Sequence, residues 1–221
     1  MTQGLLTKKI EANQQNYEDE HRDYIGASSI GSPCLRKIWY AYKGEKSENI
    51  PSKIRRTWAI GTHLESLVLD WLERAGIKII RFWCEFQSKN VESFQGHIDS
   101  MWVDEANNPK AIIEIKTAKD SSFKMFSAKG LKLWNPQYYA QIQSYMGMSA
   151  IHLAYIVVLN KDNSELLDEA VYFDADFYHS LEEKACMIAE AVSPPPRVNG
   201  SPLWYLCKTC RFNKTCHQKG E

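Results

Sequence analysis

The sequence has no excess of charge of either sign, because its 221 residues include 27 lysines and arginines and 27 aspartates and glutamates. This balance argues against a protein that coats nucleic acid by overall attraction, although a local basic groove is compatible with it. The chain also lacks an apolar run of the roughly 20 residues that cross a bilayer. Residues 1–9 lack the apolar core of a secretion signal. With 44% hydrophobic residues, we expect a folded cytoplasmic protein with one good core.

The most informative residues are two acids in apolar surroundings. Asp99 follows Gly-His-Ile, and Glu114 lies in the almost wholly apolar segment 111–115. Side chains alternate along a strand, so Glu114 and Lys116 would share one face while their neighbours take the other. If Asp99 lies on an adjacent strand, a divalent cation such as Mg²⁺ or Mn²⁺ would compensate the repulsion between the two carboxylates. The alternative is a surface hairpin in which Lys116 simply pairs with Glu114.

An aspartate at the end of one strand followed by Glu-x-Lys on the next resembles the signature of the PD-(D/E)XK nucleases. The residue before Asp99 is not the usual proline, as is common in the RecB-like branch. The resemblance implies a restriction-endonuclease-like α/β fold, with a mixed central sheet flanked by helices. It also implies metal-dependent hydrolysis of DNA, with Asp99, Glu114 and Lys116 catalytic. The metal would be held by His63, Asp99, Glu114 and the main-chain carbonyl of Ile115.

Three positions gain a role only from this resemblance. His63 would otherwise be a surface histidine on a helix, but RecB-like nucleases carry a metal-binding histidine in a similar Gly-x-His setting. Glu65, two residues on, is expected to face another direction. Gln141 and Tyr145, spaced i, i+4, match a Gln-x-x-x-Tyr motif that helps bind the substrate strand, with core packing and solvation as alternatives. Gln137 has the wrong spacing for this motif.

Six cysteines in a cytoplasmic chain favour metal or redox chemistry over disulfides. Cys207, Cys210 and Cys216 crowd the C-terminus, and Cys34 stands near the other end. Three local ligands leave one vacancy in a tetrahedral or cuboidal site, which we expect Cys34 to fill. From spacing alone, an iron–sulfur cluster and a zinc ribbon with His217 as the fourth ligand are equal alternatives.

The segment Cys-Leu-Arg-Lys-Ile-Trp-Tyr at 34–40, with three further cysteines after the core, resembles the CRISPR-associated Cas-four family, the nuclease domain of AddB and related phage exonucleases. Leu35 departs from the proline found in many relatives. The resemblance implies a 4Fe–4S cluster on all four cysteines, which would join the N-terminal helix to the C-terminal segment and close a very long loop.

The resemblance further implies an exonuclease that prefers single-stranded DNA or free ends and serves recombination, repair or spacer acquisition. It leaves open a homo-oligomer or a partner nuclease, helicase or recombination protein. Two rival functions remain: a catalytically silent DNA-binding subunit, and a zinc-ribbon interaction protein.

We expect an N-terminal arm or helix at residues 1–25, a nuclease core at 26–192, and a proline-rich spacer with the cysteine segment at 193–221. The sequence predicts helices at 33–42, 53–74, 136–148 and 174–191, and strands at 77–86, 94–103, 111–117, 151–159 and 166–173. The apolar residues expected on one stripe of the longest helix are Trp58, Leu64, Leu67, Val68 and Trp71. The segment that begins at Asp120 is compatible with either a helix or a lid loop. Lysines and aromatics interleaved over 119–134 fit either a DNA groove or a solvated amphipathic face.

Overall fold

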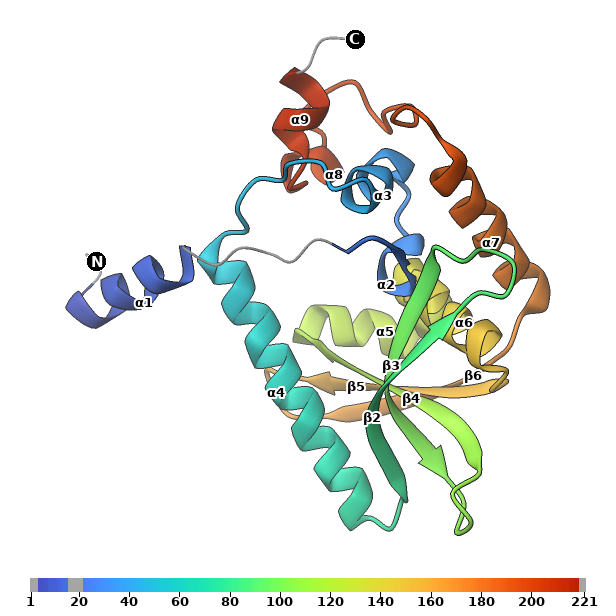
Figure 1. The fold of residues 1–221 in the computed structure, drawn as a ribbon. Helices are drawn as coiled ribbons and strands as arrows, with labels where there is room; N and C mark the ends of the chain where they lie inside the picture. The colour runs from blue at the N-terminus through green and yellow to red at the C-terminus, as the bar shows by residue number, and fades with distance from the viewer. Residues whose placement is uncertain (1–3, 16–21, 219–221) are drawn as a thin grey trace.

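The computed structural model describes residues 4–15 and 22–218, without the side chains of residues 14, 15, 82–84 and 99. Within these residues, a mixed β-sheet of six strands lies at the centre (Figure 1). The strands are β1 (Ile25–Gly26), β2 (Ile79–Gln87), β3 (Phe94–Val103), β4 (Pro109–Ala118), β5 (Leu153–Asn160) and β6 (Leu166–Tyr172). β1 runs parallel to β3 and β4 runs parallel to β5, whereas the other paired strands are antiparallel. The predicted mixed sheet is therefore confirmed.

One face of the sheet is covered by α4 (Ser52–Arg74). Val68 and Leu69 of this helix pack against Ile113 and Ile115 of β4 and against Val157 of β5. Because side chains alternate along a strand, the residues between the two isoleucines point to the other face. The alternation predicted for β4 is thus confirmed.

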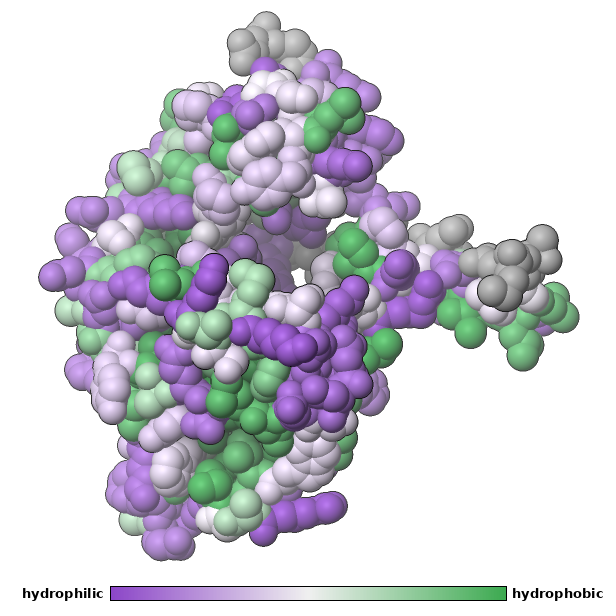
Figure 2. All heavy atoms as spheres, turned by 180° about the vertical axis from the view of Figure 1, so that it is seen from behind, coloured by the Kyte–Doolittle hydropathy of each residue, from purple (hydrophilic) through white to green (hydrophobic). Residues whose placement is uncertain are grey.

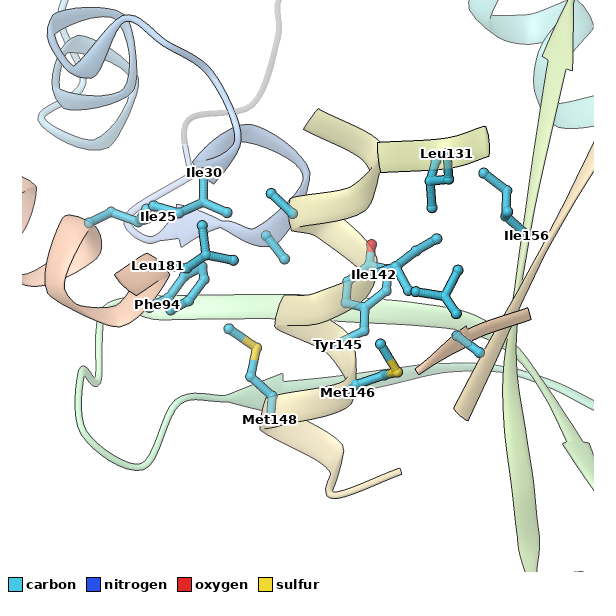
Figure 3. Packing of buried hydrophobic residues seen from close by; sticks show 14 of the residues in the cluster. Ile25, Ile30, Phe94, Leu131, Ile142, Tyr145, Met146, Met148, Ile156 and Leu181 are labelled. Atoms are coloured by element: carbon cyan, nitrogen blue, oxygen red, sulfur yellow. The ribbon is translucent and has the colours of Figure 1, made fainter. Parts of the chain in front are cut away.

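The opposite face carries the larger apolar cluster, with α6 in its middle. Figure 3 shows Phe94 and Leu181 on one side of α6, and Leu131 and Ile156 on the other. The helices on this side are α2 (Ala27–Ile30), α5 (Asp120–Trp134), α6 (Pro136–Ser149) and α7 (Ala175–Glu190). The sheet is therefore flanked by helices on both faces, as expected.

Capping residues fix where two of these helices begin. The Asn135 side chain accepts hydrogen bonds from the main-chain N–H groups of Gln137 and Tyr138, and Pro136 takes the first helical position of α6. Asp174 caps α7 in the same way. Both helices match their predicted ranges to within two residues. α5 is a helix, which decides between the helix and the lid loop that the sequence left open.

A lobe apart from the sheet holds α3 (Leu35–Tyr42), α8 (Tyr205–Lys208) and α9 (Asn213–Gln218), at the top of Figure 1. We call these three helices the cysteine lobe. The rings of Tyr40 and Phe212 lie 5.5 Å apart, and Phe212 is buried. The Trp39 indole N–H donates to the carbonyl of Ala191 over 2.8 Å. The helix that follows Cys34, α3, therefore meets the C-terminal segment, as the cysteine pattern predicted.

The first helix, α1 (Leu5–Gln15), projects from the body beside the start of α4 (Figure 1). An ion pair of 2.7 Å between Glu11 and Arg56 connects the two helices. Among the helices in the described ranges, none is long and apolar enough to cross a membrane. The domain boundaries at residues 25 and 192 stay predictions.

One departure from prediction concerns the apolar stripe of α4. Val68 is buried and Trp71 packs against the sheet, but Trp58 is 54% exposed. Gly61 lies beside Thr117, which is close to the C-terminal end of β4. The turn of α4 before Gly61 therefore extends past the sheet, and Trp58 does not share the packed face of the predicted stripe. Leu67 of the same stripe is 39% exposed as well.

Candidate active site and cysteine cavity

The candidate active site lies where β3 and β4 part. One edge of β3 pairs with β2 along most of its length. The opposite edge pairs with β1 at Phe94 and Gln95, and with β4 at residues 101–103. Between these contacts, residues 96–100 face no strand across this edge within the described part of the chain. The opening contains the Gly-His-Ile-Asp motif that the sequence singled out.

Glu114 is a buried carboxylate on the central strand β4, with 4% of its surface exposed. Its Oε1 lies 2.6 Å from the Nζ of Lys116, whose side chain is 17% exposed. The two side chains share one face of the strand, as the alternation predicted. Lys116 does pair with Glu114, as the surface-hairpin alternative held, but β4 lies between β3 and β5 and is therefore not a surface hairpin.

Gln141 and Tyr145 of α6 are both buried, and Gln141 lies between Glu114 and the Tyr145 hydroxyl. The Gln141 amide donates to Glu114 Oε1 over 3.0 Å and to the Tyr145 hydroxyl oxygen over 2.8 Å. Gly96 permits this arrangement, because a Cβ there would lie 2.9 Å from the Tyr145 ring. The structure therefore brings the predicted Gln-x-x-x-Tyr pair to Glu114, while its contact with a DNA strand stays a prediction.

Glu65 is a member of the site that the sequence reasoning missed. Its Oε1 lies 3.7 Å from the Nζ of Lys116. The helix comes close to β4 at Gly61, where an added Cβ would be 4.0 Å from Thr117 Oγ1. Glu65 is one helical turn further on, on the same face of α4. The i, i+4 spacing of a glycine and an acid was the signal that could have identified it.

His63 lies between Gly61 and Glu65 but is exposed. Its Nδ1 is 2.8 Å from the Ala59 carbonyl oxygen, which can only accept a hydrogen bond. The Nδ1 atom therefore carries the proton, and the neutral ring would present Nε2 as a metal ligand. The ring bonds to Ala59 rather than to Glu114 or Lys116, so a metal role for His63 stays a prediction.

Asp99 belongs to β3, but its side chain lies outside the described residues, so its predicted role is untested. Nearby, the Ser100 hydroxyl donates to the carbonyl of Ile113 over 2.8 Å. This bond joins β3 to β4 at the point where their main-chain pairing stops. It holds the two strands together at the edge of the opening.

Three oxygen atoms converge on the Lys116 ammonium: Glu114 Oε1 at 2.6 Å, the Ile115 carbonyl at 3.1 Å and Glu65 Oε1 at 3.7 Å. Burial disfavours the charged amine and so lowers its pKa, but the carboxylates of Glu114 and Glu65 outweigh this effect and raise the pKa of Lys116 overall. Lys116 is thus a cation at neutral pH.

The same three oxygen atoms are of the type that Mg²⁺ and Mn²⁺ prefer. The ammonium marks the place where a cation is stabilised, which is how these residues fit a divalent ion. Among the described side chains, no three His, Cys, Asp or Glu residues form a group that could hold a metal ion. A complete set of side-chain ligands at this place therefore needs a contribution from outside them, for which Asp99 is the candidate.

A second candidate site is a cavity of about 110 Å³ in the cysteine lobe. Cys34, Cys207, Cys210 and Cys216 all line it, together with His217. Cys34 precedes α3, whereas the others belong to or adjoin α8 and α9. The structure therefore brings together the four cysteines that the sequence grouped.

The charges around this cavity suit an anionic group. Burial raises the pKa of the Cys207 thiol, and the neighbouring sulfurs of Cys34, Cys216 and Cys210 raise it further. Arg36, Lys37 and Arg197 also line the cavity. Arg36 donates to the Cys216 sulfur over 3.8 Å, and Arg197 donates to the Cys216 carbonyl over 2.7 Å. The three cations would offset the charge of thiolates that bind a metal centre.

The spacing of the ligands bears on which metal group fits. Zinc bound by four sulfurs at about 2.3 Å would draw them to within roughly 4 Å of one another. No three cysteines in the described ranges are arranged to hold a single ion, yet all four surround one cavity. A metal group on these four cysteines therefore stays a prediction.

Comparison with known proteins gives a family for this sequence. The family model described as the YqaJ-like viral recombinase domain matches residues 16–152. No curated protein sequence matches the chain.

Several solved structures share the fold. An alkaline exonuclease, LHK-Exo from Laribacter hongkongensis, is 14% identical and superposes with a TM-score of 0.59, covering 82% of this chain and 90% of its own. A phage-related exonuclease from Haemophilus somnus 129PT is also 14% identical, with a TM-score of 0.55 over 76% and 92%. The protein SSO0001 is 18% identical, with a TM-score of 0.57 over 99% and 98%.

These findings confirm the expected PD-(D/E)XK nuclease superfamily and its mixed α/β fold. They do not show a Cas-four or AddB type, so that narrower resemblance stays a prediction. The likeness to SSO0001 extends over nearly the whole chain, and hence over the cysteine lobe.

Proposed function

We propose, from the premise that the chain belongs to the YqaJ-like viral recombinase domain family, that the protein is a metal-dependent DNA exonuclease. It hydrolyses phosphodiester bonds and prefers single-stranded DNA or free ends. LHK-Exo, which shares the fold, has been crystallised with dAMP, the product unit of a DNA exonuclease. The comparison supports DNA as the substrate class.

The observation that carries this proposal is the buried Glu114–Lys116 pair at the opening between β3 and β4. A carboxylate and an ammonium group are expensive to bury, and such pairs add little net stability. Here Gln141 and Glu65 add further polar contacts to the pair. A functional role explains why these groups are gathered in the sheet. The rival hypothesis of a catalytically silent DNA-binding subunit does not need this cluster.

We assign the ligand roles from the geometry. Glu114, Glu65 and the Ile115 carbonyl would hold Mg²⁺ or Mn²⁺, together with Asp99. The register that pairs Met101 with Ile112, continued by two residues, would set position 99 opposite Glu114. Bound there, the ion would supply Lewis-acid chemistry that polarises the phosphate and activates a water molecule.

The protein's own groups have three tasks in the mechanism. The Lys116 ammonium donates a hydrogen bond to the attacking water or to a phosphate oxygen, and it stabilises the negative charge that develops there. Without the ion the pKa of Lys116 is raised, so it could act as the base only if the bound cation lowered that pKa. Gln141 holds the Glu114 carboxylate in one orientation through its amide. Tyr145 in turn fixes Gln141, so both are positioning residues, with a further contact to the DNA strand proposed for the pair.

Cleavage of end-labelled single- and double-stranded DNA in Mn²⁺ tests the proposal. Asp99→Ala and Lys116→Ala should abolish cleavage, whereas the exposed Lys119→Ala should cleave like the wild type. Retained cleavage by either active-site variant would refute the mechanism. Absence of cleavage by the wild type, with intact DNA binding, would favour the silent subunit.

A second pair of variants decides the remaining ligand. Glu65→Gln should reduce both cleavage and Mn²⁺ affinity if this carboxylate binds the ion. His63→Ala should do so if the histidine was correctly predicted. Mn²⁺ affinity measured by calorimetry separates these effects from loss of substrate binding. An unchanged affinity in both variants would leave Asp99 and Glu114 as the protein's side-chain ligands.

We further propose that the cysteine cavity binds a 4Fe–4S cluster through Cys34, Cys207, Cys210 and Cys216. The support is the gathering of all four around one cavity, with cations beside it. Protein purified without oxygen should be brown and contain iron and sulfide. A colourless protein with one equivalent of zinc would instead support a zinc ribbon with His217, which also lines the cavity, and would reopen the interaction-protein hypothesis.

A further inference from the structure

A groove of about 810 Å³ lies between the cysteine lobe and the first turns of α4. Its size falls within the range of ligand-binding sites. Figure 2, which shows the molecule from behind, has a hollow between the lobe and the body. The walls come from α2, α3, the loop before α4, α4 itself, α6 and residues 202–214.

The groove leads to the candidate active site along two helices. Trp58 of α4 lines it, seven residues before Glu65, which is about 10 Å along the helix axis. Gln137 of α6 lines it too, one turn or about 6 Å before Gln141. The helices that deliver Glu65 and Gln141 to the catalytic cluster therefore form two walls of the groove.

The charge of the lining is positive although the chain as a whole is neutral. The cations that line it are Lys37, Lys208, Arg211 and Lys214, against a single carboxylate, Glu48. Lys214 lies 3.5 Å from Glu48, which offsets that one negative charge. This local excess of positive charge complements a phosphate backbone.

The groove also exposes large apolar side chains, which a fold normally buries. Trp58 is 54% exposed, Ile54 is 40% exposed and Leu203 is 78% exposed, and all three line the groove. Sites for single-stranded nucleic acid combine cations that follow the backbone with aromatic side chains on which bases stack. A duplex hides the faces of its bases, so an exposed tryptophan favours a single strand.

We propose that this groove holds a single-stranded DNA end and guides it to the catalytic cluster, with Trp58 stacking on a base and Lys208 and Lys214 contacting phosphates. The inference rests on the proposed nuclease function for its direction, from groove to active site. The groove itself is tested by binding, which needs no cleavage.

The first test measures how the full chain binds a short fluorescent oligothymidylate in EDTA, by anisotropy. Trp58→Ala should weaken binding roughly 5- to 100-fold, the loss expected for one stacked base. Trp58→Phe should retain most of the affinity because it keeps a ring. Tyr172→Ala, which removes a ring that is 73% exposed on β6, is the control and should bind like the wild type.

The second test uses the salt dependence of the same binding. Each lost phosphate contact lowers the slope of log affinity against log salt by about 0.7 for a single strand. Lys208→Gln combined with Lys214→Gln should therefore lower the slope by about 1.4. Lys89→Gln combined with Lys161→Gln, at exposed positions outside the groove, should leave it unchanged.

The outcomes separate the two proposals. If the wild type cleaves DNA but Trp58→Ala and the groove lysine variant bind like the wild type, the groove assignment is wrong and the nuclease stands. If the wild type never cleaves but the groove variants weaken binding as expected, the proposed nuclease function is wrong and the groove assignment is supported. Tighter binding of a blunt duplex than of the single strand also overturns the groove assignment.

Discussion

Replacing Lys116 by methionine tests whether its ammonium occupies the place of a divalent cation. Methionine keeps an unbranched side chain that is one atom shorter, and it removes the charge. Glu114, with its side chain 5% exposed, would keep the Gln141 amide as a partner and lose its counter-charge. Breaking a buried ion pair from one side costs roughly 3–5 kcal/mol, and we take about 3 because this amide remains.

The expected result in EDTA is a fall in Tm of about 6–12 °C, since 1 kcal/mol shifts a protein of this size by about 2–4 °C. In saturating Mn²⁺ we expect the variant to gain more stability than the wild type. The ion no longer competes with the ammonium for the oxygens of Glu114, Ile115 and Glu65. At a fixed ion concentration, a ligand that binds more tightly stabilises the folded state more, so Mn²⁺ should raise the Tm of the variant more than that of the wild type.

The pH dependence supplies an internal check. Because the pKa of Lys116 is raised, its contribution to stability is complete below the ordinary lysine pKa of about 10.4 and is lost only as the pH rises through the higher value. The difference in Tm between wild type and variant in EDTA should therefore stay constant from about pH 7 to 9. Lys119→Met, at an exposed position, is the matched control. Equal stability in EDTA, or an equal response to Mn²⁺, would refute the reasoning.

Three further predictions concern the support of the site. Gly96→Ala places a Cβ 2.9 Å from the Tyr145 ring, so urea denaturation should show a loss of about 1–3 kcal/mol and kcat should fall; Gly200→Ala, with open space around it, should change neither. Gln141→Leu frees the carboxylate that it orients, and Mn²⁺ affinity or cleavage should drop roughly 10- to 100-fold. Asn135→Ala removes the cap of α6 and should cost about 0.5–2 kcal/mol, with metal binding by the folded fraction unchanged.

The sheet and its acids were predictable because the underlying rule is local. Alternation along one strand sufficed to place Glu114 and Lys116 on one face and their isoleucine neighbours on the other. The cysteine pattern likewise predicted that the two chain ends meet. For the strand, a short segment determines its own geometry through alternation and burial of its apolar side. The cysteines were grouped instead by their number and spacing, although they lie at opposite ends of the sequence.

Helix faces were predicted less well, because their direction depends on what they pack against. Glu65 was expected to face another direction, but the close approach at Gly61 sets which face of α4 meets β4, and Glu65 lies on that face. The spacing of Trp58 fits an apolar stripe, but at that turn α4 extends past the edge of the sheet and leaves Trp58 exposed. The basic segment 119–134 was considered for DNA, yet Phe123 and Phe126 are buried and cannot stack on bases. The groove lies elsewhere, between segments distant in sequence.

The position of the groove links the cysteine lobe to catalysis. Cys210 lines both the cysteine cavity and the groove, so the wall that carries Lys208 and Lys214 is held where the four cysteines meet. If a cluster joins them, it closes a loop that spans most of the chain, and its loss frees that wall entropically. Cys34→Ser should therefore weaken oligothymidylate binding, while Mn²⁺ binding at Glu114, on the rigid sheet, stays intact.

Cys186→Ser is the matched control for this last prediction, since that cysteine lies on α7 and does not line the cavity. Calorimetry with Mn²⁺ and anisotropy with the labelled strand measure the two effects separately on the same preparation. A parallel loss of both would mean that the lobe supports the whole fold rather than the groove. Unchanged strand binding in a Cys34→Ser protein without iron would show that the groove wall stands without the cluster.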